Sequence, residues 1–172
     1  MLGIGYQEAV KIRKSKGLTS SQMEAQGNEE YLIYFGRAHV KDFETGLLAR
    51  GPLKIGRGKF KTALLRGRNQ PGVDFRIYAE IILYNNNDTY ALEGVAKRIF
   101  KDNNIKGDQG QKELYNFTDA DLFKIVPDLA EVGTDCLQIQ IKSINFFNNN
   151  NVEEVIFENK SNFHKLFIEQ GW

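Results

Sequence analysis

Basic side chains are concentrated in one stretch of this chain, between residues 50 and 68. The stretch contains no acidic residue, although the formal net charge of the whole chain is only +1. Positive charge gathered on an otherwise neutral protein attracts phosphate groups. Taken alone, the stretch fits either a phosphate-binding surface or a solvated helix face. Its basic residues are Arg50, Lys54, Arg57, Lys59, Lys61, Arg66 and Arg68.

A tyrosine and a glutamate flank this stretch within predicted elements. Tyr34 lies in an apolar run over residues 31–36 that predicts a strand, and Lys54 lies in a second such run over residues 53–56. Facing residues of two antiparallel strands lie about 5 Å apart, so we expect Lys54 to approach Tyr34 and either to hydrogen-bond the nucleophilic water or to hold Tyr34 partly ionised. Glu93 lies beside the apolar stripe of a predicted helix. Taken alone, these residues also fit a core tyrosine and a surface glutamate.

The order of these segments resembles the GIY-YIG nuclease superfamily, and most closely its phage- and virus-type branch, whose second motif reads KIG. The resemblance covers roughly residues 29–120. Leu32 stands at the position of the first-motif glycine, and the connection over residues 37–52 is longer than the usual hairpin of the family. The matching residues are Leu32-Ile33-Tyr34, Lys54-Ile55-Gly56, Arg66, Glu93 and Glu113-Leu114-Tyr115.

The resemblance implies a metal-dependent DNA endonuclease that hydrolyses phosphodiester bonds. In this family pattern Tyr34 assists the attack of a water molecule, with Lys54 beside it, and Arg66 holds the scissile phosphate. Glu93 is the ligand of one Mg²⁺ or Mn²⁺ ion, which needs few protein carboxylates. The alternative is a catalytically inactive nucleic-acid-binding module of the same fold, and a protein-interaction domain is a third hypothesis.

Several neighbouring residues extend or compete with this assignment. We expect DNA contacts from Arg57, Lys59, Lys61 and Arg68. Arg68 and Arg57 are also alternatives to Arg66, because a one-turn error in the predicted helix would exchange them. The late asparagine of the family corresponds to either Asn103 or Asn104, and Tyr31 and His39 are weaker candidates for the site.

The pattern predicts an α/β (α+β) fold: a small, mostly antiparallel three-stranded sheet flanked by helices, with an extra C-terminal strand–helix element. The domains expected are an N-terminal helical extension over 1–28, a nuclease-like domain over 29–120, and an appendage over 121–172 that packs on it. The predicted strands cover residues 31–36, 53–56, 75–83, 137–147 and 152–157, with a short strand near 113–117. The predicted helices cover 60–68, a segment starting at Asp88 or Thr89, a segment capped by Thr118 or Asp119 that Pro127 breaks or kinks, and 162–170.

The sequence contains no motif for a disulfide, a histidine–cysteine metal site or a nucleotide-binding loop. The single Cys136 cannot form an internal disulfide, and neither His39 nor His164 has metal-type spacing with it. No glycine-rich segment has the spacing of a P-loop or the context of a Rossmann fold, and no apolar run is long enough for a membrane span. The resemblance implies a protein encoded by a phage or large virus, located in the cytoplasm or elsewhere inside a host cell. We expect it not to be secreted and to bind DNA rather than membranes, and a homodimer is one expected assembly.

Overall fold

The computed structural model describes residues 3–5, 8, 11, 30–41, 44–46, 48–58, 73–105, 113–148 and 151–155. The predicted helices over 60–68 and 162–170 lie outside the described residues. So does most of the predicted N-terminal extension.

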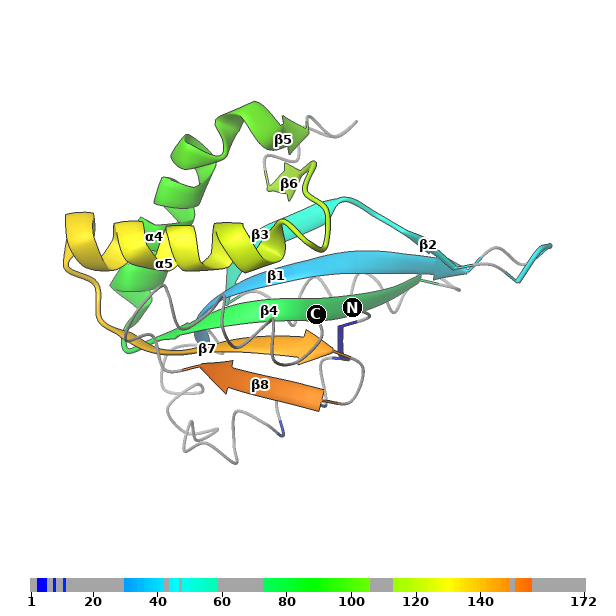
Figure 1. Cartoon of the computed structure of the whole chain (residues 1–172), viewed down its shortest axis with the longest axis horizontal. Coiled ribbons are helices and arrows are strands. Elements are labelled where there is room, and N and C mark those ends of the chain that lie inside the picture. The colour runs from blue at the N-terminus through cyan, green and yellow to red at the C-terminus, as the bar shows by residue number, and fades with distance from the viewer. Residues whose placement is uncertain are drawn as a thin grey trace.

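Eight strands form one sheet, and every described strand pairing is antiparallel. The strand order is β5-β6-β3-β1-β4-β7-β8, with β2 paired to β1 outside this path (Figure 1). The predicted α+β class and the antiparallel sheet are confirmed. The strands are β1 Glu30–Lys41, β2 Leu48–Arg50, β3 Leu53–Gly58, β4 Val73–Leu83, β5 Asn104–Ile105, β6 Leu114–Tyr115, β7 Ile141–Asn148 and β8 Asn151–Val155.

The prediction of three strands is wrong. The expected trio β3-β1-β4 forms the middle of the sheet, but β6 pairs with the outer edge of β3 and β7 with the outer edge of β4. The alternating apolar residues of β7 explain this, because they continue the buried faces of β4 rather than forming a separate layer. The C-terminal segment is therefore joined to the sheet through backbone hydrogen bonds.

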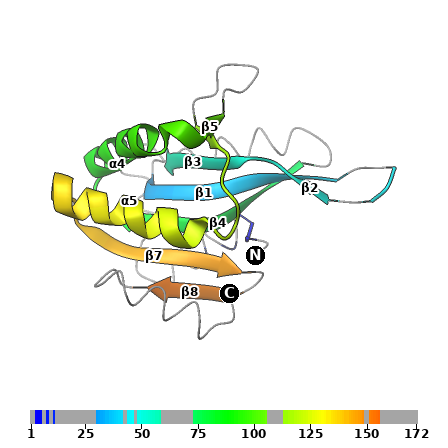
Figure 2. The same cartoon turned by 45° about the horizontal axis from the view of Figure 1, so that its top comes forward.

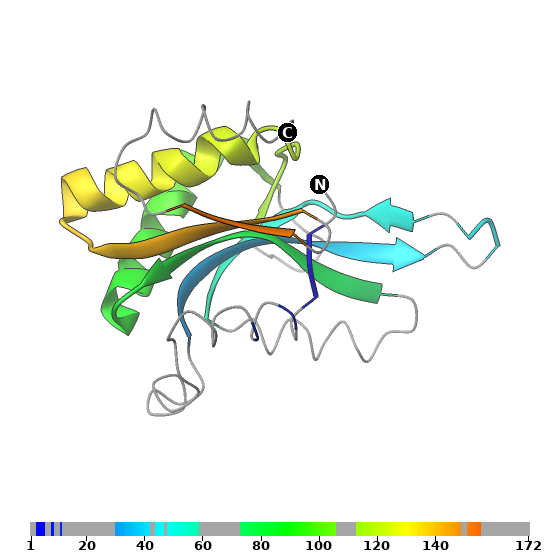
Figure 3. The same cartoon turned by 60° about the horizontal axis from the view of Figure 1, so that its bottom comes forward.

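Two helices lie together on one face of the sheet (Figure 3). α4 (Asn86–Ile99) packs against β1 and β3, α5 (Leu122–Leu137) packs against β4, and a short 3₁₀ turn, η1 (Lys101–Asn103), follows α4. Apolar side chains of the sheet and of both helices form the main core between these layers, including Ile33, Phe35, Ile55, Leu92 and Leu129. This core fixes α4 beside β3, and α4 carries Glu93.

The opposite face of the sheet carries a second apolar cluster. Here Tyr34 packs with Leu32, Ile77 and Phe147, and its ring meets the edge of Phe75 at a centroid distance of 6.0 Å. The N-terminal residue Ile4 joins this cluster and forms an isolated antiparallel bridge to Ile77. β7 pairs with β4 only from Ala79 to Leu83, and Ile4 pairs with β4 just outside that range, at Ile77.

β1 is longer than the prediction, and Gly36 lies inside it. The register between β1 and β4 shifts between Phe35 and Gly36, and β1 then continues to Lys41 and pairs with β2. A Cβ at Gly36 would lie 2.6 Å from the ring of Phe75, so a glycine permits the close approach of the two strands. Described residues of the connection over 37–52 thus extend β1 and form β2, and these strands, with the adjoining end of β4, make an arm that extends beyond the helices (Figure 2).

The boundaries of both helices also differ from the expectation. α4 is capped by Asn85, whose side-chain oxygen accepts a hydrogen bond from the backbone of Asp88 at 2.8 Å. α5 runs without interruption through Pro127 and ends at Leu137, so the predicted break at the proline is wrong. Gln138 then adopts a left-handed conformation with φ of 55°, which ends the helix and delays the strand to Ile141.

Candidate active site at the edge of strand β3

The hydroxyl group of Tyr34 lies against the backbone of Gly56. The two residues face each other across β1 and β3, and a Cβ built at Gly56 would lie 2.5 Å from the Tyr34 hydroxyl oxygen. Any larger residue at this position would push the tyrosine away. The glycine of the second motif therefore makes room for the tyrosine of the first motif.

Glu93 reaches the same part of β3 from the helix side. Its Oε2 accepts a hydrogen bond from the backbone N–H of Arg57 at 3.2 Å, one residue beyond Gly56. The preceding outward-facing N–H, that of Ile55, donates to the carbonyl of Glu113 at 3.1 Å. β6 pairs only with Leu53 and Lys54 of β3. The Glu93 carboxylate therefore binds the outer edge of β3 just beyond the residues that pair with β6.

Two cationic side chains surround Glu93. Its Oε1 lies 3.7 Å from Nε of Arg57 and 3.5 Å from Nζ of Lys97, one helical turn further along α4. The Arg57 guanidinium also lies over the ring of Tyr90, 3.3 Å from its centroid. Arg57, expected to contact DNA, is therefore engaged within the protein, and its side chain is only 11% exposed.

Lys54 lies two residues away from the position expected for it. The register places it opposite Gly36, while Gly56 stands opposite Tyr34. Its ammonium group pairs with the Glu113 carboxylate at 3.4 Å. The expectation that Lys54 faces Tyr34 directly is therefore wrong, because the strand register is offset by one side-chain pair.

The electrostatics of Tyr34 also run opposite to the expectation. The side chain is 2% exposed, and its burial, followed by the charges of Glu113 and Glu93, raises the pKa of the Tyr34 hydroxyl far above its ordinary value. Burial and the same two glutamates raise the pKa of Tyr115 to about 12. Lys54 does not hold Tyr34 partly ionised, and Tyr34 is a neutral phenol near pH 7.

The remaining predicted residues fall into three groups. Arg66, Lys59, Lys61 and Arg68 lie outside the described residues. The two asparagines considered for the late family position have local partners: Asn103 donates to the carbonyl of Asn116 at 3.3 Å and Asn104 to that of Leu114 at 3.1 Å. Tyr31 packs against the main core.

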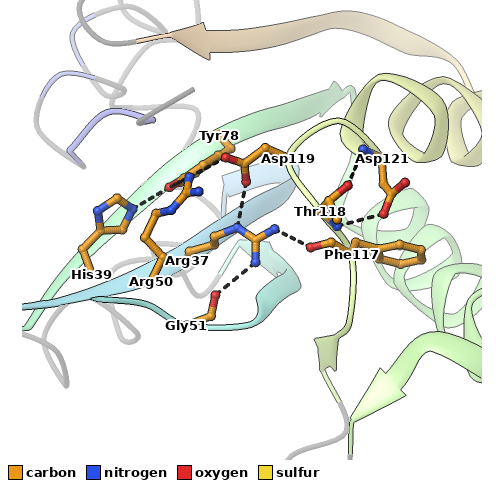
Figure 4. A network of polar contacts seen from close by, with 9 residues as sticks. All are labelled: Arg37, His39, Arg50, Gly51, Tyr78, Phe117, Thr118, Asp119 and Asp121. Atoms are coloured by element: carbon orange, nitrogen blue, oxygen red, sulfur yellow. Dashed lines mark hydrogen bonds and ion pairs between the residues drawn. The ribbon is translucent and has the colours of Figure 1, made fainter. Parts of the chain in front are cut away.

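A second polar cluster lies further along β1 (Figure 4). Arg37 donates from Nε to Asp119 at 3.0 Å, from Nη1 to the carbonyl of Gly51 at 3.0 Å, and from Nη2 to the carbonyl of Phe117. Asp119 also pairs with Arg50. These contacts join the segment before α5 to β1 and to the turn between β2 and β3, so we interpret the cluster as a structural clamp.

His39 belongs to this clamp rather than to the candidate site. Its Nε2 lies 2.6 Å from the hydroxyl of Tyr78, and Nη1 of Arg50 lies 3.4 Å from the same oxygen. Burial lowers the pKa of His39, and the charges of Arg76 and Arg50 lower it further. Both His39 and Tyr78 are almost fully buried, which fits a packing role.

Sequence reasoning missed a buried polar row that crosses the sheet beside Tyr34. Glu80 on β4 stands opposite Tyr34, and Asn145 on β7 stands opposite Glu80. Nδ2 of Asn145 donates to Oε1 of Glu80 at 3.0 Å, and both side chains are buried. The signal was present, since Glu80 interrupts an apolar strand, but its partner lies 65 residues away along the chain.

Among the described residues, no cluster of three or more histidine, cysteine, aspartate or glutamate side chains forms a metal site. A magnesium ion needs only one or two carboxylates and keeps several waters, so Glu93 fits such a sparse donor set. The two ion-pair distances that Glu93 makes with Arg57 and Lys97 exceed the usual hydrogen-bond length.

Comparison with protein-family models, with curated proteins and with solved structures finds no match to this chain. Within the described part of the chain, no helix has both the length and the apolar character needed to cross a lipid bilayer.

Proposed function

We propose that this chain is a metal-dependent DNA endonuclease of the GIY-YIG type. The observation that carries the proposal is the meeting of Tyr34 and Glu93 at neighbouring residues of β3. Tyr34 approaches Gly56 from β1, and Glu93 binds the backbone of Arg57 from α4. These side chains are 59 positions apart in the sequence and approach neighbouring residues of β3 from the two faces of the sheet, which supports a shared site at this strand.

The burial of Tyr34 decides which role each residue has in the proposed reaction. Tyr34 keeps its proton and orients the attacking water through its hydroxyl group. Glu113 exerts the largest charge effect on Tyr34 and is partly exposed, so we assign the water's proton to its carboxylate. Lys54 offers positive charge to the phosphate, and Arg66 would add two parallel donors. Glu93 would hold the Mg²⁺ or Mn²⁺ ion, which when bound stabilises charge on the phosphate and on the leaving oxygen.

A catalytically inactive nucleic-acid-binding module is the second candidate. It is favoured by the 2% exposure of Tyr34 and by the contacts of Glu93 with Arg57 and Lys97, which give the glutamate a structural role. Such a module binds DNA without a divalent metal, loses affinity steeply with added salt, and cuts no strand.

The test is a plasmid-nicking assay with purified protein and Mg²⁺ or Mn²⁺. We expect the wild type to cut, and Glu93→Gln to lower the rate by about a hundredfold or more while DNA binding is kept. Asp135→Asn, which removes an exposed carboxylate at the end of α5, is the matched control and should cut normally.

Two results decide between the candidates. DNA binding without cleavage under any metal condition supports the inactive module. Normal cleavage by Glu93→Gln would show that Glu93 is not the metal ligand and would contradict this mechanism.

A further inference from the structure

Tyr90 forms an exposed aromatic platform beside the candidate site. Its side chain is on the surface of α4 with 49% exposure, and the guanidinium of Arg57 lies 3.3 Å from the centroid of its ring. Arg57 is itself held by Glu93 through both its backbone N–H and its side chain. The ring is therefore supported on one side by a fixed cation and open to solvent over much of its area.

The helix surface next to this ring has open space and carries one lysine. Tyr90, Glu93 and Lys97 follow one another at spacings of three and four residues, so they share one face of α4. A Cβ built at Gly94, one turn beyond Tyr90, would meet no atom within 4 Å. The side chain of Lys97 is 40% exposed. An aromatic ring, free space and a cation thus occur in succession along one helix.

We propose that Tyr90 stacks with an unpaired nucleobase of a DNA substrate, with Lys97 positioned for the adjacent phosphate. The inference rests on the proposed function of the neighbouring site and names its substrate class: DNA with a single-stranded or extruded nucleotide. A base within a duplex is covered on both faces by its neighbours, so only an unstacked base can cover an exposed ring. Aromatic stacking of this kind is tolerant of sequence, and an arginine on the other face of the ring strengthens the platform.

A purely structural role for Tyr90 predicts different behaviour. In that case the ring only shields the Arg57 guanidinium from water, and its loss would affect all DNA forms equally through the Glu93 site. The comparison of paired with unpaired DNA therefore distinguishes the two roles.

The experiment measures fluorescence anisotropy in EDTA, so that no strand is cut. Three labelled DNAs of the same sequence are compared: a single strand, a full duplex, and a duplex with one bulged base. We expect the wild type to bind the bulged duplex more tightly than the full duplex. Tyr90→Ala should lose about tenfold or more in affinity for the bulged and single-stranded DNAs and less than about twofold for the full duplex.

Three variants complete the design. Tyr90→Phe keeps the ring and should bind as the wild type does. Tyr84→Ala removes another exposed tyrosine, which takes no part in this stack, and should also bind normally. Tyr90→Leu keeps apolar cover over Arg57 and replaces the alanine variant if a thermal melt shows that the latter does not fold.

The inference is overturned if the loss is equal on paired and unpaired DNA, if Tyr90→Phe loses as much as Tyr90→Ala, or if the wild type binds no DNA that contains an unpaired base. The nuclease proposal fails separately. Tyr90-dependent binding with no cleavage in Mg²⁺ overturns the nuclease and supports the stacking platform. Cleavage of the bulged duplex in Mg²⁺, at a DNA concentration below saturation, that is unchanged in Tyr90→Ala supports the nuclease and overturns the platform.

Discussion

Tyr34 combines a packing role with a place in the proposed active site. Its ring belongs to the second apolar cluster, while its hydroxyl reaches the β3 backbone through the space left by Gly56. A phenol in this environment keeps its proton, because burial and two glutamate charges oppose ionisation. Its contribution to the proposed reaction is therefore a fixed hydroxyl dipole rather than an anionic base.

The space at Gly56 can be tested by stability measurements. We expect Gly56→Ala to lower the free energy of unfolding by about 1–3 kcal/mol, because the added methyl group overlaps the Tyr34 hydroxyl. In combination with Tyr34→Leu, the loss should be smaller than the sum of the two single losses, since the overlap is then removed. Urea denaturation measures all three variants.

Gly94 provides the matched control for a glycine-to-alanine change. It lies inside α4 and has open space around it, so alanine there should raise stability by about 0.5–1 kcal/mol. Equal effects at Gly56 and Gly94 would contradict the close approach of Tyr34.

His39 predicts a pH dependence of stability. Its pKa is lowered in the folded state, while the unfolded chain keeps a value near 6.5. Below pH 6.5 the unfolded state therefore binds a proton that the folded state excludes, and stability falls as the pH decreases from about 7 to 5. His39→Gln should flatten this part of the profile in urea titrations at several pH values. An unchanged slope would show that His39 does not titrate differently on folding.

The residues that sequence reasoning selected for chemistry were found because each belongs to a short motif, but their pairings were not. The motif order placed Tyr34 and Glu93 near β3, whereas the offset of Lys54 depends on the register of β1 and β3. That register depends on packing across the sheet, which the residues of the two strands alone do not reveal. Glu80 was overlooked because its partner, Asn145, lies on a strand distant in the sequence.

Two kinds of contact hold the strands and helices around the candidate site. α4 places Glu93 at the β3 edge by burying its apolar face on β1 and β3, and β6 covers the rest of that edge. The Arg37–Asp119 clamp joins the segment before α5 to the β1–β2 arm. Most strand positions were predictable from apolar alternation, but the arm was not, since residues 37–50 mix polar and apolar types and the β1–β4 register shifts at Gly36.

The clamp should contribute measurably to stability. Asp119→Asn removes the carboxylate that balances Arg37, whose side chain is 9% exposed, so we expect a loss of about 2 kcal/mol in the free energy of unfolding. Asp74→Asn is the control, because Asp74 is 60% exposed in its pair with Arg76 and should cost less than about 1 kcal/mol. Similar losses for both variants would argue against a buried clamp.

Across the whole molecule, the sheet is packed on both faces, and segments distant along the chain complete it. The helices cover one face, while Ile4 joins the apolar cluster of the other and hydrogen-bonds to Ile77 in both directions, at 2.8 and 2.9 Å. The short apolar patch at residues 2–4 gave no indication of this role, because its partner strand lies more than 70 residues later.

Ile4 therefore tests whether the N-terminal residues stabilise the sheet. Ile4→Ala should lower the free energy of unfolding by about 2–4 kcal/mol, since the side chain is 1% exposed. Val40→Ala, at a position that is 42% exposed, should change it by less than about 0.5 kcal/mol. A thermal or urea melt of both variants gives the comparison, and an Ile4→Ala value as small as that of Val40→Ala would contradict the docking of the N-terminal residues.

The pairing of β7 with β4 has a practical consequence for anyone who trims this protein. A fragment that ends at residue 120 keeps the motif residues, but β4 loses its hydrogen-bonded neighbour β7, and Ile81 and Ile82 become exposed. An exposed edge strand of this kind pairs with other copies of the chain, so such a fragment should precipitate or form aggregates. Expression of soluble material therefore calls for a boundary placed after β8.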